Sequence, residues 1–110
     1  MDFCMEKKKD GLRVEYHKNG LLKSKGYYKD GKPDGVWEYF YENGQLENTG
    51  HWVHGQKEGL WRTNRYNGQL EFEGHYKHGK HNGFWKYFNE DGTLRENWTG
   101  FYRNGKKISD

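Results

Sequence analysis

A pattern of glycines and aromatic residues returns at 24-residue intervals along the chain and indicates its fold. Its first copy is Gly26-Tyr27-Tyr28-Lys29-Asp30-Gly31-Lys32-Pro33-Asp34-Gly35-Val36-Trp37. The same arrangement of glycines and aromatic residues occupies residues 50–61 and 74–85. In each copy a glycine is followed two residues later by an aromatic residue, and the copy closes on a tryptophan. Repetition at a fixed period indicates an array of identical structural units.

The period extends over almost the whole chain of 110 residues. It holds for several glycine series, for Trp37, Trp61 and Trp85, and for Leu22, Leu46, Leu70 and Leu94. The last copy is displaced by two residues, which must lie within 95–99. We therefore predict a single repeat domain over residues 1–110. Its repeats lie near 20–43, 44–67, 68–91 and 92–110, and residues 1–10 form a degenerate half-repeat.

Each unit contains two turn signals. The first is a pair typical of type I′ hairpin turns, at Asn19-Gly20, Asn43-Gly44, Asn67-Gly68 and Asp91-Gly92. The second is a longer glycine-rich turn, at Asp30–Gly35, His54–Gly59, His78–Gly83 and Asn104–Lys107. The segments between these turns are rich in aromatic and branched residues, which favour strands. We predict strands near 12–17, 22–29, 36–41, 46–53, 60–66, 70–78, 84–88 and 94–103.

The predicted fold class is all-β: an elongated, single-layer antiparallel β-meander built from tandem 24-residue hairpin repeats. Side chains alternate between the two faces of a strand, so Gly26 and Tyr28 share one face and the lysines between them the other. A glycine within a strand lets a neighbouring aromatic ring lie across the backbone. The repeated glycine and aromatic positions therefore predict a stacked aromatic stripe on one face.

The segments 26–37, 50–61 and 74–85 are similar to MORN repeats. The Tyr-x-Asn-Gly-Gln-Leu pattern of Tyr41–Leu46 resembles the bacterial MORN variants that are often described as antitoxins. The resemblance covers about residues 11–107 and implies a twisted, single-layer sheet of hairpins. For function it implies protein scaffolding, contact with anionic lipid or, for the bacterial variant, neutralisation of a toxin.

Composition excludes several classes of protein. The chain has no alanine and 16 glycines, which excludes a helical bundle, and no apolar run is long enough to span a membrane. Its only cysteine, Cys4, fits a reducing compartment, so we expect a cytoplasmic protein. The only serines, Ser24 and Ser109, lack the sequence context of a nucleophile, and phosphate-binding glycine motifs are absent. We expect no enzymatic activity and no cofactor.

The histidines and basic residues do not form an evident ligand site. Equivalent histidines, such as His51 and His75, lie two strands apart, about 9.6 Å, which is too far for one zinc ion. We expect no metal. The chain has no continuous basic stripe, and glutamates are mixed into the strands that carry exposed aromatic residues, which argues against nucleic acid as a partner. The basic N-terminal segment makes a membrane surface a less favoured alternative.

Departures from the repeat give the candidate binding residues. The middle copy has Thr63 and Asn64 where the first copy has Tyr39 and Phe40, and two arginines flank them. The insertion places Asn97 and Trp98 in a predicted bulge, and bulges often re-aim side chains near binding sites. Exposed tryptophan and arginine are typical anchors of interfaces. The predicted partner-binding residues are Trp52, Trp61, Arg62, Asn64, Arg65, Tyr66, Glu71, Glu73, His75, Asn97 and Trp98.

These observations predict a non-enzymatic protein-binding module. The most specific form of this hypothesis is an antitoxin or immunity-like inhibitor, bacterial or phage, that binds a toxin, an effector or a host enzyme. In that reading Arg62 and Arg65 serve binding and contribute little to stability. The alternatives are a peripheral module that binds anionic lipid and a structural scaffold that associates edge to edge through strands 12–17 and 94–103.

Overall fold

The computed structural model describes residues 10–110. The predicted half-repeat at the N-terminus and Cys4 lie outside these residues, apart from Asp10. The described part contains ten strands and no helix: β1 (Gly11–Tyr16), β2 (Leu22–Lys29), β3 (Lys32–Pro33), β4 (Gly35–Phe40), β5 (Leu46–Val53), β6 (Gln56–Asn64), β7 (Leu70–Lys77), β8 (Lys80–Tyr87), β9 (Gly100–Arg103) and β10 (Lys106–Ser109).

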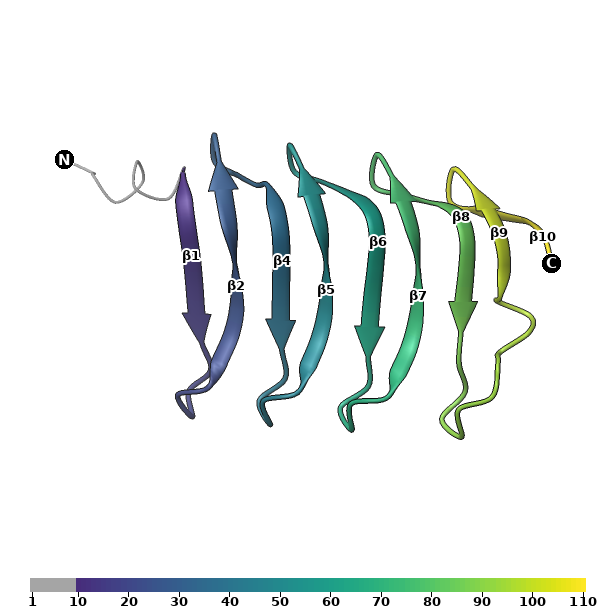
Figure 1. Cartoon of the computed structure of the whole chain (residues 1–110), viewed down its shortest axis with the longest axis horizontal. Helices are drawn as coiled ribbons and strands as arrows, with labels where there is room; N and C mark the ends of the chain where they lie inside the picture. Colours follow the sequence, from purple (N-terminus) through teal and green to yellow (C-terminus); the bar gives the residue numbers. More distant parts are fainter. Residues whose placement is uncertain (1–9) are drawn as a thin grey trace.

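The strands form one open antiparallel sheet in which neighbours in sequence are neighbours in space (Figure 1). Only the short β3 leaves this order, because it pairs back onto β2 while β4 follows β2 in the sheet. The longest dimension, 54 Å, runs across the strands. The structure confirms the predicted all-β, single-layer meander of hairpin repeats.

The glycine-rich turns are shorter than predicted. At Asp30-Gly31, His54-Gly55, His78-Gly79 and Asn104-Gly105 both residues have a positive φ, 53° and 82° in the first copy. This is the backbone of a two-residue type I′ turn, and the chain re-enters a strand directly after it. The prediction of a long loop was wrong because the residue that ends each predicted segment, a glycine in three copies and Lys107 in the last, is part of the next strand.

The Asn-Gly pairs also differ from the prediction, because they do not form type I′ turns. Only the glycine has a positive φ, and the loop closes when the Gly20 amide donates to the His17 carbonyl at 2.9 Å. The Asn19 side chain accepts a hydrogen bond from the Leu21 amide. An asparagine that bonds the backbone two residues on stabilises this three-residue loop without adopting a positive φ itself.

The predicted strand over 94–103 is wrong in its first half. Leu94 makes only an isolated bridge to Phe88, and the amides of Trp98 and Thr99 both donate to the Arg95 carbonyl. The two inserted residues therefore form a turn instead of a bulge within a strand. The sheet resumes at Gly100, where β9 begins.

The core of the sheet consists of tryptophans that lie on glycines. Trp37, Trp61 and Trp85 are 5%, 2% and 0% exposed. Each covers the glycine eleven residues earlier, on the preceding long strand, and a Cβ atom on that glycine would overlap the indole ring. Each indole N–H donates to the carbonyl that follows that glycine, as from Trp61 to His51 at 3.1 Å. The predicted aromatic stripe is therefore confirmed.

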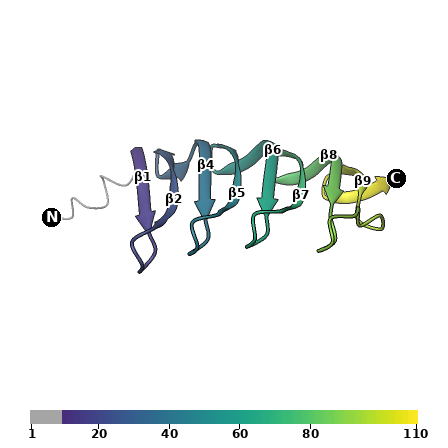
Figure 2. The ribbon, with the colours of Figure 1, turned by 60° about the horizontal axis from the view of Figure 1, so that its bottom comes forward.

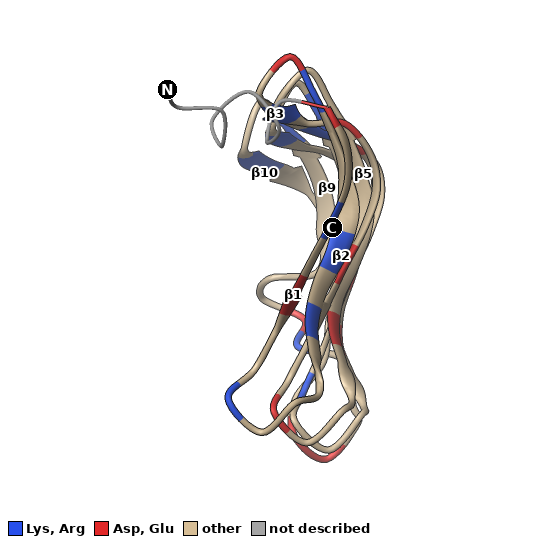
Figure 3. Ribbon diagram, turned by 90° about the vertical axis from the view of Figure 1, so that its left-hand side faces the viewer, with Lys and Arg blue, Asp and Glu red and all other residues tan. Residues whose placement is uncertain are grey.

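The two faces of the sheet differ in shape. Seen along the long axis, the strands are bent, and β3 and β10 turn toward the concave side (Figure 3). Pro33 of β3 lines the same small hollow as Tyr28 and Trp37, so the tryptophans lie on the concave face. We call this the inner face. The opposite, convex face is the outer face.

Hydrogen bonds between equivalent loops hold successive repeats together. The Asn-Gly loops lie along one side of the sheet, where the strands end, and the type I′ turns lie along the opposite side; we call these two sides the loop edges (Figure 2). Along the Asn-Gly edge Tyr41 donates to the Asn64 carbonyl, and His17 and Arg65 bond the equivalent carbonyls of their next repeats. At the other edge the carboxylates of Asp10, Asp34 and Glu58 each accept the first amide of the next type I′ turn.

Replacing Gly50 with alanine should disrupt the core. The new Cβ atom would overlap the Trp61 indole, so the ring must leave its place, at an expected cost of about 3 kcal/mol and a fall in Tm of roughly 12 °C. Gly79→Ala is the control, because Gly79 has a positive φ but open space around it, which costs about 1 kcal/mol. Thermal unfolding followed by circular dichroism measures both. Equal losses would contradict the glycine–tryptophan contact as the basis of the core.

Candidate protein-binding face

The outer face carries a stripe of exposed apolar and aromatic side chains that includes two histidines. It consists of four cross-strand pairs: Leu12 with Tyr27, Val36 with His51, Leu60 with His75, and Phe84 with Phe101. All eight residues are exposed, and Val36 is the most exposed of the apolar ones at 61%. We call these eight residues the outer stripe. Within the described residues no second layer covers it.

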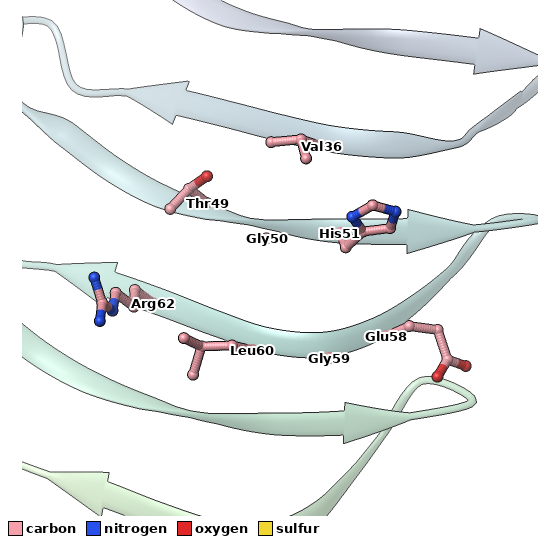
Figure 4. A pocket seen from close by; sticks show the side chains of 8 residues that line it. All are labelled: Val36, Thr49, Gly50, His51, Glu58, Gly59, Leu60 and Arg62. Atoms are coloured by element: carbon pink, nitrogen blue, oxygen red, sulfur yellow. The ribbon is translucent and has the colours of Figure 1, made fainter.

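A row of mostly charged residues runs beside the outer stripe. Each member lies two positions in sequence from a stripe residue on the same strand. Cross-strand pairing joins its members in the order Lys25, Glu38, Thr49, Arg62, Glu73 and Lys86. We call it the charged row. Stripe and row meet around a shallow hollow of about 550 Å³, whose walls include Val36, His51, Leu60 and Arg62 (Figure 4).

The sequence contains a signal for the outer stripe that the repeat analysis overlooked. In every copy the residue after the first glycine of a strand is apolar: Leu12, Val36, Leu60 and Phe84. Each of these residues directly precedes the core tryptophan position of its repeat in sequence. Its side chain therefore points to the opposite face of the sheet. An apolar residue at a solvent-facing position in all four copies makes this face a candidate binding surface.

Three of the predicted binding residues lie on this face. Arg62 and Glu73 belong to the charged row, where their side chains pair at 2.8 Å, and His75 belongs to the outer stripe. The Arg62 side chain is 57% exposed and the Glu73 side chain 19%. The pair therefore presents its guanidinium to solvent beside the apolar stripe.

A second group lies at the Asn-Gly loop edge. Tyr66 is 56% exposed there and packs edge-on against Tyr41. Arg65 donates to the Phe88 carbonyl at 2.8 Å, and Glu71 lies 3.8 Å from its guanidinium. The Asn64 carbonyl accepts from Tyr41. Arg65 occupies the repeat position of His17 and Tyr41, so its described contacts serve the junction between repeats.

The two predicted tryptophan anchors lie on the inner face. Trp61 is a core residue, and Trp52 packs edge-on against it with ring centroids 5.4 Å apart. Tyr39 stacks on Trp37 and Tyr87 stacks on Trp85, whereas Thr63 places no ring beside Trp61. Thr63 bonds Asn48 instead, which helps to leave an inner hollow of about 300 Å³ lined in part by Trp52 and Trp61.

Asn97 and Trp98 lie in the turn created by the insertion. Trp98 is 51% exposed; it packs edge-on against Tyr87, and the Arg95 guanidinium lies 4.7 Å from its ring centroid. The Asn97 carbonyl accepts from Lys107. Trp98 therefore packs toward the inner face, whereas Asn97 lines a hollow together with Phe84 of the outer stripe. The predicted binding residues therefore occupy separate places rather than one site.

One inner-face position carries Pro33, Lys57 and His81 in successive repeats, each near its core tryptophan. The Lys57 ammonium lies 4.8 Å from the Trp61 ring centroid, and burial lowers the Lys57 pKa. His81 stacks on Trp85 at 3.8 Å, and burial, followed by the charge of Lys57, lowers the His81 pKa. The hydroxyl of Tyr87 bonds His81, and burial raises the Tyr87 pKa to about 12.

Two other kinds of site have no counterpart in the residues that the structure describes. Over residues 10–110 no three histidine, cysteine, aspartate or glutamate side chains converge to hold a metal ion. In the same range no helix is long and apolar enough to cross a bilayer. The outer stripe with its charged row is thus the most extensive candidate binding surface in this part of the chain.

These features define a repeat protein made of tandem β-hairpins in a single sheet. The sequence model of the MORN repeat variant matches residues 9–30, 33–54 and 57–78, which together make up more than half of the chain. The chain therefore belongs to the MORN repeat variant family. The matches recur every 24 residues, as predicted, and end before the insertion. No curated protein matches the sequence. Membership is consistent with a non-enzymatic repeat module.

The two arginines of the middle copy should differ in their effect on stability. Arg65→Ala removes a charge-assisted bond to the next repeat, at about 2 kcal/mol, and should lower Tm by roughly 8 °C. Arg62→Ala removes only an exposed ion pair and should cost less than about 0.5 kcal/mol. Denaturant unfolding of both variants tests this prediction. A larger loss for Arg62→Ala would overturn this division of roles.

His81 should make stability depend on pH. Its folded-state pKa is lowered, so the unfolded chain takes up the proton first as the pH falls. Stability should therefore be complete above about pH 6.5 and decline below it. Between about pH 7.5 and pH 5, Tm should fall more for the wild type than for His81→Gln. Parallel pH profiles of the two proteins would exclude His81 as the cause.

Proposed function

We propose that this chain is a protein-binding module whose outer stripe covers an apolar surface on another protein. One observation carries the proposal: six exposed apolar or aromatic residues and two exposed histidines form four cross-strand pairs on one face of the described sheet. Interfaces bind through apolar anchors surrounded by polar residues, and the charged row supplies such a border along one side.

The shape and chemistry of the face support an inhibitor more than a carrier of small molecules. The hollow beside Leu60 is shallow and open, whereas pockets for small ligands enclose most of their ligand. A long, rigid face can instead cover a functional surface of its partner. We therefore propose an antitoxin or immunity-like inhibitor that acts by occlusion, on a toxin, an effector or a host enzyme. The residues proposed for contact now include Val36, Leu60 and Phe84 beside Arg62, Glu73 and His75.

Affinity capture from a lysate of the native host tests this proposal. The bait proteins are the wild type, Leu60→Glu on the outer stripe and Leu21→Glu as a control. Leu21 and Leu60 are equally exposed, at 45% and 43%, but Leu21 lies in an Asn-Gly loop. We expect one stoichiometric protein that Leu21→Glu retains and Leu60→Glu loses by about 100-fold in affinity. The purified partner should lose its own activity when the wild type is added.

Capture that both variants retain equally would show that the outer stripe is not the binding surface. Circular dichroism of the variants provides the check on folding, because both substitutions lie on exposed side chains and should leave the spectrum unchanged. If the partner binds but keeps its full activity, the chain is a protein-binding module but not an inhibitor.

A second candidate function follows from the edge formed by the type I′ turns. Like charges face each other across three of these four turns: Lys29 and Lys32, Lys77 and Lys80, and Arg103 and Lys106. Such pairs destabilise a hairpin unless an anion binds them. The blue segments of β3 and β10 in Figure 3 mark basic residues at this edge. They favour contact with an anionic lipid surface.

Vesicle sedimentation tests this second candidate. With vesicles of phosphatidylserine and phosphatidylcholine, binding should disappear at about 0.5 M salt and in the variant Lys77→Glu with Lys80→Glu. Lys23→Glu with Lys25→Glu, away from the turns, is the matched control. Binding that is insensitive to the first pair would contradict the lipid function.

A further inference from the structure

The outer stripe and the charged row run straight along the molecule. Viewed along the long axis, the strands of successive repeats nearly superimpose (Figure 3). Each repeat therefore presents the same surface at the same height, displaced only along the axis. A straight surface of this kind can be matched by any partner that presents a straight row of complementary groups.

The charged row is complementary to itself when its order is reversed. In the direction of the sheet its charges are positive, negative, neutral, positive, negative and positive, from Lys25 to Lys86. A two-fold axis parallel to the strands and passing over Thr49 brings Glu38 against Arg62 of a second copy. The same axis brings Lys25 against Glu73 of that copy. By symmetry each contact occurs twice, which gives four attractive pairs and no repulsive one.

The same two-fold axis also aligns the outer stripes. Val36 of one copy faces Leu60 of the other, Leu12 faces Phe84, and Tyr27 faces His75. His51 meets its own equivalent on the axis. Val36, the most exposed apolar residue of the stripe, therefore stands against the hollow that Leu60 lines. Apolar contacts and charge pairs agree on one arrangement.

Other arrangements of two copies satisfy the charged row less well. Moving the axis half a strand spacing in either direction places Lys25 against either Lys86 or Arg62 of the second copy. An axis over Arg62 places that residue against itself. With an axis between Arg62 and Glu73, the only attractive pair is Arg62 of one copy with Glu73 of the other. Like charges that face each other cost affinity, so the arrangement centred on Thr49 is favoured.

We propose that, in the absence of its partner, this protein forms a symmetric homodimer through the outer stripe, with the two sheets face to face and their repeats running in opposite directions. The inference rests on the proposed function, because it assigns the partner-free state of the same binding face. Dimer formation covers Leu60 and Arg62, so the second copy and the partner protein compete for one surface. The concentration of the protein then regulates how much free face is available.

The dimensions of the face indicate a weak dimer. The two copies overlap from β1 to β8, six strand spacings or about 29 Å, and the stripe with the charged row is about 14 Å wide. The buried area is then roughly 400 Å² per copy, the size of a weak or transient interface. The convex shape of the outer face limits contact to this strip. We expect a weak dimer, with a dissociation constant on the order of 10 μM or above.

Sedimentation velocity of the purified chain from about 1 to about 200 μM tests the dimer. We expect a monomer at the low end and a dimer at the high end. Glu38→Arg and Arg62→Glu should each weaken dimerisation about tenfold or more, since each creates two repulsive contacts. The double variant should return to within about threefold of the wild type, because the pair is restored across the interface.

The double variant separates contacts between copies from effects within one copy. A disturbance within each sheet would add in the double variant, whereas a contact between copies is repaired. Leu21→Glu is the apolar control and should dimerise normally, and Leu60→Glu should be monomeric. A monomer at all concentrations, or additive losses in the double variant, would overturn the dimer.

These outcomes are distinguishable from a failure of the proposed function. A monomeric protein whose partner capture still depends on Leu60 overturns the dimer and leaves the partner-binding face intact. A dimer whose wild type captures no partner overturns the proposed function alone. Added partner should dissociate the dimer; a partner that binds the dimer without dissociating it would overturn the competition.

Discussion

The contact between each core tryptophan and the glycine eleven residues before it determines the rest of this structure. A single-layer sheet has no second layer to bury its side chains, so it must bury them against its own backbone. Glycine removes the Cβ atom that would keep the indole away, and the indole N–H then reaches the carbonyl that follows the glycine. Since the glycine and tryptophan lie on the two strands that each type I′ turn connects, this contact recurs once in every 24-residue repeat.

That constraint divides the repeat positions into two kinds. The inner face and the two edges hold residues with a partner in the next unit, such as Tyr41 and Asp34. The outer face holds residues whose side chains are not needed for burial. A threonine at position 36 or 60 would suit the strand as well and would expose less apolar surface. We therefore assign the apolar residues at these positions to the proposed protein-binding surface.

The features that depend on residue spacing were predicted correctly from the sequence. The turn types were not, because the same residues can adopt two backbone conformations. The meander, the faces and the aromatic stripe follow from the positions of Gly50 and Trp61. The turn types were exchanged, because Asn19 lowers the energy of its loop through its side chain, whereas His54 accepts a positive φ in a turn closed by its neighbours. The role of Arg65 was missed because its repeat equivalents, a histidine and a tyrosine, share only the ability to donate a hydrogen bond.

The candidate site was harder to predict because departures from a repeat have two physical causes. Thr63 departs on the inner face, where it exchanges a stacked ring for a bond to Asn48, and Trp98 departs because an insertion changes the turn. The outer stripe shows the opposite behaviour: it is regular although its residues meet only their cross-strand neighbours, such as Phe84 and Phe101, and no second layer of the described fold covers them. In a repeat protein, regularity at an uncovered position is therefore better evidence of a binding surface than irregularity, since drift produces irregular positions but does not place an exposed apolar residue in every copy.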